Sequence, residues 1–192
     1  MTSREKILSN VKANKPIAES ELPIVPDYTQ ALTREESLAL FTQNLVDNKA
    51  VLYTFSSDEE LSSLIVSQWP DHQHIHAPML PYLHNSPGTV AANSQLDIAV
   101  VKGRLGVANN GAIWVKDEDL EHRSIPFLTK YLVILLDAND IVYNLHEAYM
   151  RLSSEDFDYG VWISGPSKTG DIEQALVIGA HGPLEMMVGL KG

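Results

Sequence analysis

The chain of 192 residues contains no cysteine. Without thiols it forms no disulfide bond, has no thiolate nucleophile and holds no zinc or iron–sulfur cluster through cysteine ligands. A redox centre built on cysteine would have to lie on another protein. We therefore expect this chain to carry no cofactor of its own.

Basic residues are also scarce. The sequence has 14 Lys and Arg side chains against 25 Asp and Glu, which gives a formal net charge of −11. Nucleic acids and anionic membranes are bound through clustered basic side chains that replace counterions. The sequence has no such cluster, so we expect no nucleic-acid partner.

Long apolar runs are missing as well. The longest, Tyr131 to Leu136, is far shorter than the roughly 20 residues that a membrane-spanning helix needs. The polar N-terminal segment lacks the apolar stretch of a secretory signal. The sequence therefore predicts a cytoplasmic protein with no membrane span.

The remaining composition is that of a folded protein, with 44% hydrophobic and 20% charged residues. Strand-like runs such as Ala50 to Phe55 alternate with helical patterns, for example those that begin at the capping boxes of Thr33 and Ser57. This alternation predicts a layered α/β fold. We expect residues 1–30 to form an N-terminal helix and a proline-containing connector, and residues 31–192 a single α/β domain.

The segment that follows the strand-like run Tyr159 to Ile163 is the richest in groups that bind ligands. It precedes a helical pattern from Asp171 to Ile178. Glycines let a ligand approach the backbone, a helix start offers unpaired N–H groups, and hydroxyls and a lysine add donors. An ordinary helix cap uses the same residue types, so both interpretations stay open. The anion site would comprise Ser164, Gly165, Ser167, Lys168, Thr169, Gly170 and Asp171.

A turn formed by Asn109, Asn110 and Gly111 separates two further apolar runs. Asn and Gly tolerate positive φ, and loops after strands gather at one edge of an α/β sheet. We therefore expect this turn to lie beside Gly165 and to frame the same cleft. Lys168 should supply the main side-chain attraction for an anion, because the overall field of the protein opposes one.

Three other residues are candidates for the same cleft. His181 and Gly182 follow the predicted helix, where the imidazole could act as a general base, contact a ligand or hold the turn. Arg123 lies in a loop that could fold over the site, although a surface position is the default for arginine.

Alternate histidines at positions 72, 74 and 76 would share one face of a strand, close enough to bind a metal. No carboxylates are interleaved with His72, His74 and His76, and a proline-rich loop follows. An exposed edge strand explains the pattern, so we predict no metal site.

The run from Ser164 to Glu173, followed by Gly179 to Pro183, resembles the signature of the LUD-domain family. That signature is close to S/T-G-P-S-R/K-T-A/G-D-I-E, then G-V-H-G-P before a last strand. The segment from Val107 to Ile113 is similar to a second family segment, A-E-T-G between two strands. The resemblance is nearest to the branch of stand-alone lactate-utilisation C proteins and extends, more weakly, over residues 30–192.

The resemblance implies a mostly parallel sheet with helices on both faces, as in the sugar-phosphate isomerase and CoA-transferase-like fold. It also implies a role in the oxidation of L-lactate to pyruvate beside partner proteins that carry iron–sulfur clusters. The absence of cysteine agrees with this division of labour. The chain would then be a non-redox component that binds a small organic anion. The alternative is an isomerase-like or CoA-transferase-like enzyme that uses the same site.

Two departures from the family pattern favour binding over catalysis. Asn109 and Asn110 stand where the family commonly has Glu-Thr, and an amide cannot ionise. Lys168 replaces the commoner Arg, which keeps the charge but removes a bidentate donor. We therefore assign no catalytic residue.

Overall fold

The computed structural model describes residues 2–15, 24, 26, 28, 32–85, 96–170 and 176–191. Helix α1 (Ser3–Ala13) begins with a capping box at Thr2, and none of its residues is buried. This confirms the N-terminal helix, whereas most of the predicted connector lies outside the described residues. The division of the chain near residue 30 stays a prediction. No helix in the described ranges has the length and apolar character to cross a bilayer.

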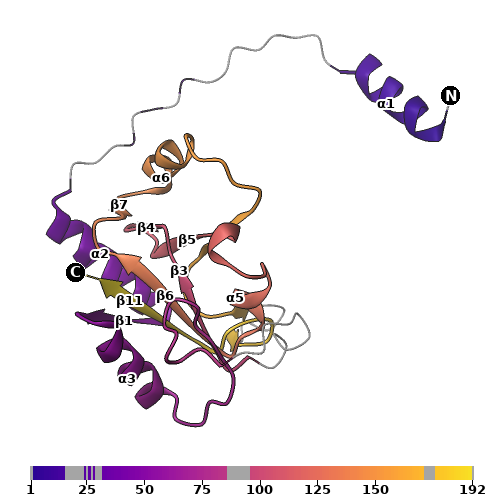
Figure 1. The fold of residues 1–192 in the computed structure, drawn as a ribbon. Coiled ribbons are helices and arrows are strands. Elements are labelled where there is room, and N and C mark those ends of the chain that lie inside the picture. Colours follow the sequence, from indigo (N-terminus) through magenta and orange to yellow (C-terminus); the bar gives the residue numbers. More distant parts are fainter. Residues whose placement is uncertain are drawn as a thin grey trace.

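A five-stranded parallel sheet forms the centre of the fold, in the order β1-β11-β6-β3-β2 (Figure 1). The last strand along the chain is thus inserted between the first strand and β6. Strands covered on both faces are expected to be apolar along their length, as β3 and β6 are up to their last residues. The bounds are β1 (Ala50–Phe55), β2 (Ile75–His76), β3 (Ile98–Lys102), β6 (Tyr131–Asp137) and β11 (Glu185–Lys191).

Helices cover both faces of this sheet. Helix α2 (Arg34–Asp47) buries Phe41 and Leu45 in the core on one face. Helix α3 (Asp58–Gln68) buries Leu61 and Ile65 in the core on the other face. The predicted α/β fold, with a mostly parallel sheet between helices, is confirmed.

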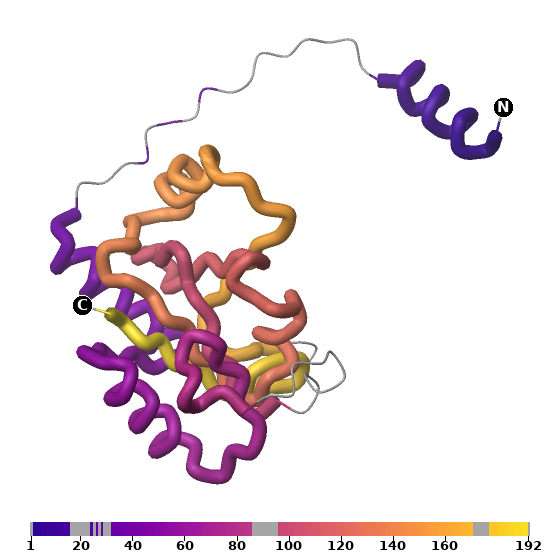
Figure 2. The backbone as a smooth tube through the Cα atoms, in the orientation of Figure 1, coloured from indigo at the N-terminus to yellow at the C-terminus, as the bar shows by residue number. Residues whose placement is uncertain are grey.

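A second, four-stranded sheet lies on the α2 side, in the order β7-β4-β5-β8. Ile113 and Ile163 pack toward the central sheet, whereas Trp114 packs toward helix α6 (Leu145–Leu152). Figure 2 shows α6 and α3 at opposite sides of the body. The bounds are β4 (Leu105–Val107), β5 (Ala112–Lys116), β7 (Ile141–Val142) and β8 (Gly160–Ile163).

Strands β4 and β8 run in the same direction, because each is antiparallel to β5, which lies between them. Their carboxyl ends therefore meet at one edge of the second sheet. The connection from β5 to β6 contains a short 3-10 helix, η1 (Asp117–Asp119), and α5 (Ile125–Leu128).

Two predicted elements differ from the structure. The helix predicted from Asp171 to Ile178 is wrong at its end, because β10 (Leu176–Ile178) pairs antiparallel with β9 (Lys168–Gly170). The β-branched Val177 and Ile178 favour this pairing; residues 171–175 lie outside the described ranges. The strand predicted over residues 72–76 is reduced to the two residues of β2.

The carboxylate of Asp97 joins the start of β3 to its neighbours. Its Oδ2 accepts hydrogen bonds from the backbone N–H groups of Gln73 (2.8 Å) and His74 (3.1 Å), and Lys130 Nζ donates to its Oδ1 (2.5 Å). Burial by itself would raise the pKa of Asp97, but these donors outweigh it and lower the pKa to about 2. The charged carboxylate thus fixes the amino ends of β2, β3 and β6 relative to one another.

Replacing Asp97 with Asn should lower the free energy of unfolding at neutral pH by about 2 kcal/mol, because the amide loses the charge that Lys130 pairs with. A lowered carboxylate pKa stabilises the fold above the unfolded-state pKa of about 4, and this contribution is lost as the pH falls through the folded-state pKa. The difference between wild type and Asp97→Asn should therefore shrink from pH 4 toward pH 2 in urea unfolding. A difference that is constant with pH would contradict this account.

Candidate functional site

The two predicted loops meet at the end of helix α2. Asn48, the C-cap of α2, donates through Nδ2 to the carbonyl of Asn110 and to Ser164 Oγ, each at 2.9 Å. Ser164 Oγ donates in turn to the Asn110 carbonyl, also at 2.9 Å. The loops that follow β4 and β8 thus lie side by side, as the sequence predicts. Asn48 joins the two loops. It was not predicted, because nothing in the sequence around a helix C-cap indicates a contact with residues so far along the chain.

Glycine lets both loops approach α2 closely. Gly165 has φ of 76°, and a Cβ there would lie 2.2 Å from the Asn48 carbonyl oxygen. Gly111 has φ of 64°, and its Cβ would lie 3.1 Å from backbone atoms of Asn44 and Leu45. Other residues rarely adopt this conformation, and here they would also clash with the helix end.

Lys168 is directed to the same helix end. Its Nζ donates to the Asn48 carbonyl (3.1 Å) and to Asn48 Oδ1 (3.2 Å). Burial, and then the neighbouring charge of Lys49, lower the pKa of Lys168. A cation is favourable at a helix C-terminus, where carbonyl groups remain unpaired. The structure thus shows Lys168 as a cap of α2.

Four of the predicted residues line a pocket of about 220 Å³, which we call the signature pocket: Gly165, Ser167, His181 and Gly182. Ser167 donates its N–H to the Pro183 carbonyl and accepts at its own carbonyl from Gly179 N–H, each at 2.9 Å. A Cβ on Gly182 would lie 3.1 Å from Ser167 Cβ. The side of the pocket formed by these residues is therefore held by backbone contacts, and no lysine or arginine is among the described residues that line it.

The remaining predicted residues are not part of this pocket. The guanidinium of Arg123 lies 5.3 Å from the centre of the Tyr159 ring. Thr169 and Gly170 belong to β9, so the segment leads into a strand and not directly into the helix start that was predicted. The side chain of Asn109 is exposed. Asp171 lies outside the described residues.

The alternate histidines do not share a strand face. His76 is buried in β2 (1% exposed), its Nδ1 lies 3.5 Å from Glu121 Oε2, and burial lowers its pKa. His72 Nδ1 contacts the Trp69 carbonyl instead. Among the residues that the structure describes, no three His, Asp or Glu side chains are arranged to hold a metal ion.

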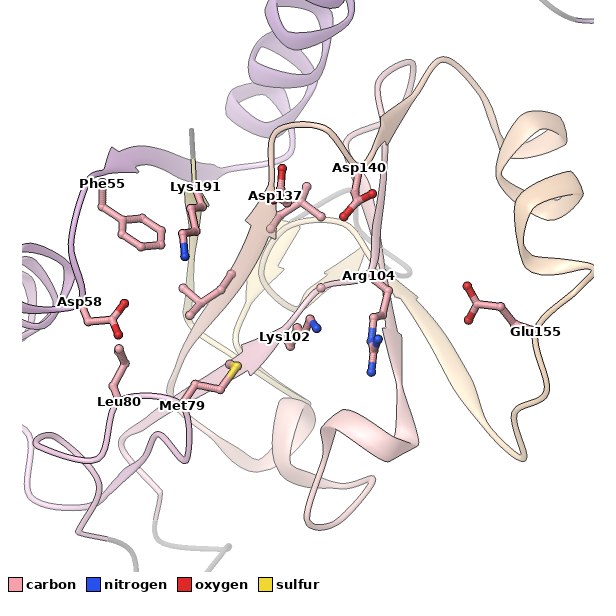
Figure 3. Close-up of a pocket in the computed structure, with 13 residues that line it drawn as sticks. Phe55, Asp58, Met79, Leu80, Lys102, Arg104, Asp137, Asp140, Glu155 and Lys191 are labelled. Atoms are coloured by element: carbon pink, nitrogen blue, oxygen red, sulfur yellow. The ribbon is translucent and has the colours of Figure 1, made fainter.

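A larger cavity, of about 530 Å³, lies at the opposite edge of the central sheet (Figure 3). We call it the carboxyl-edge cavity, because the last residues of four parallel strands line it: Phe55, Lys102, Asp137 and Lys191. The signature pocket lies at the other edge, where Pro183 leads into β11. In α/β sheets the carboxyl edge is the usual place for ligands. The sequence shows its residues only as isolated charges, each at the end of an apolar run.

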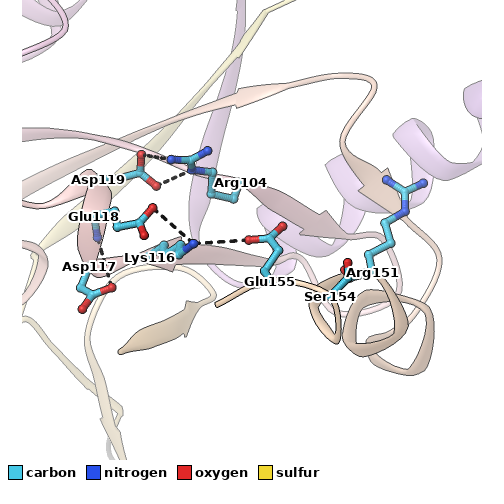
Figure 4. A network of polar contacts seen from close by, with 8 residues as sticks. All are labelled: Arg104, Lys116, Asp117, Glu118, Asp119, Arg151, Ser154 and Glu155. Atoms are coloured by element: carbon cyan, nitrogen blue, oxygen red, sulfur yellow. Dashed lines mark hydrogen bonds and ion pairs between the residues drawn. The ribbon is translucent and has the colours of Figure 1, made fainter. Parts of the chain in front are cut away.

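Ion pairs hold one side of the carboxyl-edge cavity in place (Figure 4). Arg104 donates through Nε and Nη2 to both carboxylate oxygens of Asp119, at 2.5 and 2.7 Å. The hydrogen bond to Asp119 is the main reason why the pKa of Arg104 is raised. The buried Lys116 Nζ lies 3.3 Å from Glu118 and 3.7 Å from Glu155, which also lines the cavity.

Replacing Asn48 with Ala should lower the free energy of unfolding by about 1–3 kcal/mol, because the loop carbonyl and hydroxyl that it contacts lose partners in a partly buried place. Amide hydrogen exchange should also become faster around Asn110 and Ser164. Asn14→Ala is the matched control, since Asn14 caps α1 and its side chain bonds only within that helix. Equal effects of the two substitutions would show that Asn48 does not join the loops.

Comparison with known proteins identifies a family model and several similar chains. A family model described as the LUD domain matches residues 88–190, which is more than half of the chain. Lactate utilization protein C of Deinococcus radiodurans is 24% identical over 207 aligned positions, covering 100% of this chain and 97% of that protein. Lactate utilization protein C of Geobacillus kaustophilus is 26% identical over 134 residues, covering 65% of this chain.

The matched region spans only about half (54%) of the length of the Geobacillus protein. The crystal structure of a DUF162 family protein from Deinococcus radiodurans has a TM-score of 0.66 at 18% identity, covering 84% of this chain and 100% of that one, which supports the fold. The family model, the named relatives and the shared fold lead to one conclusion: this chain belongs to the LUD domain family.

Proposed function

We propose that the chain is a cytoplasmic lactate-utilisation component that binds a small organic acid and acts with iron–sulfur partner proteins in the oxidation of L-lactate to pyruvate. The names of its relatives support the lactate-utilisation role. The observation that carries the binding proposal is the signature pocket, because the residues that resemble the family signature form its wall.

The pocket suits a small acid in size and chemistry. Its volume of about 220 Å³ accommodates a three-carbon acid and is smaller than typical sites for drug-sized ligands. Ser167 offers a hydroxyl donor and His181 an imidazole, while Pro126 and Phe127 provide apolar contact for a methyl group. Without a lysine or arginine among these residues, binding would rest on the hydroxyl of Ser167 and the imidazole of His181.

In this proposal, iron–sulfur partner proteins supply the redox chemistry. Conversion of lactate to pyruvate removes two electrons, and the sequence has no cysteine to hold an iron–sulfur cluster. The proposal therefore assigns to this chain the binding of the acid, and to its partners the transfer of electrons. Purification of the full chain from its native cells, with identification of bound proteins, tests this part.

Calorimetric titration of the full chain with lactate and pyruvate tests the pocket. His181→Ala should weaken the affinity about 10-fold or more by removing a donor to the carboxylate. His74→Ala is the control, because His74 does not line the pocket. Absence of binding to wild type would overturn the proposal, and turnover of a sugar phosphate or a CoA thioester by the isolated chain would support the enzyme alternative.

Lys168→Met separates two roles of that residue. If its ammonium serves to cap α2, as its contacts indicate, the free energy of unfolding should fall by about 0.5–1 kcal/mol while the affinity for lactate and pyruvate stays unchanged. If Lys168 instead attracts the anion, the affinity should fall and stability should not. Thermal unfolding and titration of the same variant decide between these outcomes.

A further inference from the structure

Three strands of the central sheet end in a charged side chain on the same face. Residues two apart on a strand share a face, and Val100, Val133 and Met187 pack into the core on the α3 side. On that face the last residues of β3, β6 and β11 are Lys102, Asp137 and Lys191, which line the carboxyl-edge cavity. On this face, each of the three strands is thus apolar in its interior and ends in a charged residue where the sheet borders the cavity.

The cations of the cavity differ in how they are held. Arg104 is fixed by Asp119, and this pairing occupies Nε and Nη2, so other N–H donors of its guanidinium remain for a ligand. Lys102 and Lys191 form no ion pair or side-chain hydrogen bond with any residue that the structure describes. In Figure 3 the ammonium of Lys102 is on the side that faces Arg104. Two cations two residues apart therefore flank one region of the cavity.

The opposite side of the cavity is acidic and apolar. Asp58, the first residue of α3, directs its carboxylate into the cavity (Figure 3), and its side chain has no partner in the described ranges. Phe55, Leu80 and Leu135 provide apolar surface. A ligand here meets Lys102 and Arg104 at one end, where Asp140 and Glu155 also line the cavity, and the hydrogen-bond acceptor Asp58 at the other.

We propose that the carboxyl-edge cavity binds a hydroxylated phosphate monoester. The phosphate contacts Lys102 and Arg104, and a hydroxyl group of the ligand donates to Asp58. A dianion suits two converging cations better than a monocarboxylate does, and arginine held by a carboxylate presents its remaining donors in a fixed plane. The volume of about 530 Å³ exceeds what a three-carbon acid fills and lies within the range of small-molecule sites.

The lining of the cavity carries both signs of charge: three of the chain's 14 basic side chains line it, together with the carboxylates of Asp58, Asp137, Asp140 and Glu155. The site is independent of the signature pocket, which lies at the other edge of the sheet. Failure of one proposal therefore leaves the other intact.

Calorimetric titration of the full chain with ribose 5-phosphate and with AMP tests the proposal, with ribose and inorganic phosphate as reference probes. We expect at least one ester to bind more tightly than either reference. Lys102→Met should weaken ester binding about 10- to 150-fold, because a charge-assisted contact is lost. Lys6→Met, on α1, removes the same charge outside the cavity and should change nothing.

Asp58→Asn tests the hydroxyl contact separately. It should weaken binding of the ester but leave inorganic phosphate bound as well as before or better, since a repelling charge is gone. Glu59→Gln is the matched control in the same helical turn, outside the cavity. Tighter binding of ribose 5-phosphate than of AMP would identify the ligand as a sugar phosphate. Tighter binding of AMP would identify it as a nucleotide.

Three results would overturn the proposal: no ester binding to wild type at millimolar concentration, equal binding by Lys102→Met, or equal binding of ribose without phosphate. Lys102→Met should keep its affinity for lactate and pyruvate, if the signature pocket binds them. Thermal unfolding of each variant shows that the fold is kept.

Discussion

The parallel pairing of β11 with β1 on one side and β6 on the other is the constraint on which the rest of the structure depends. The final strand of the chain thereby completes the centre of the sheet, and its residues from Met186 to Leu190 are buried. Its amino end continues from Gly182 and Pro183 of the signature pocket, and its carboxyl end places Lys191 in the carboxyl-edge cavity. One strand thus links two separate cavities at opposite edges of the sheet.

The two regions differ in their electrostatics. The signature pocket is formed by backbone turns, prolines and neutral donors, which suit a small ligand with a single charged group. The carboxyl-edge cavity gathers cations and carboxylates from the ends of several strands. Ion pairs outside the cavity hold Arg104, so that its position does not depend on a ligand. Fixed charge of this kind reduces the reorganisation needed on binding.

Local sequence patterns predicted most of the fold because they reflect local physics. The capping box at Thr33 marks the start of α2, and apolar runs mark β3, β6 and β11. The hairpin of β9 and β10 was missed, because Asp-Ile-Glu after Gly170 has the local pattern of a helix start while the strand pairing depends on tertiary context.

The candidate sites show the same limit. The sequence predicted that the loops at Asn110 and Ser164 lie side by side, because loops that follow strands of the same direction lie at the same edge of a sheet. Asn48 could not be found in this way, because its contacts join residues far apart in the sequence. The carboxyl-edge cavity was missed for a related reason. Lys102 and Lys191 come together only through the order of strands in the sheet, which a single sequence does not specify.

Asn110, one of the two asparagines that depart from the family pattern, has a structural explanation. Asn110 Oδ1 accepts a hydrogen bond from Ala112 N–H, and its carbonyl accepts from Asn48 and Ser164. The side-chain contact requires an acceptor, which an amide supplies without bringing a negative charge to the loop. The amide at this position therefore secures the loop junction.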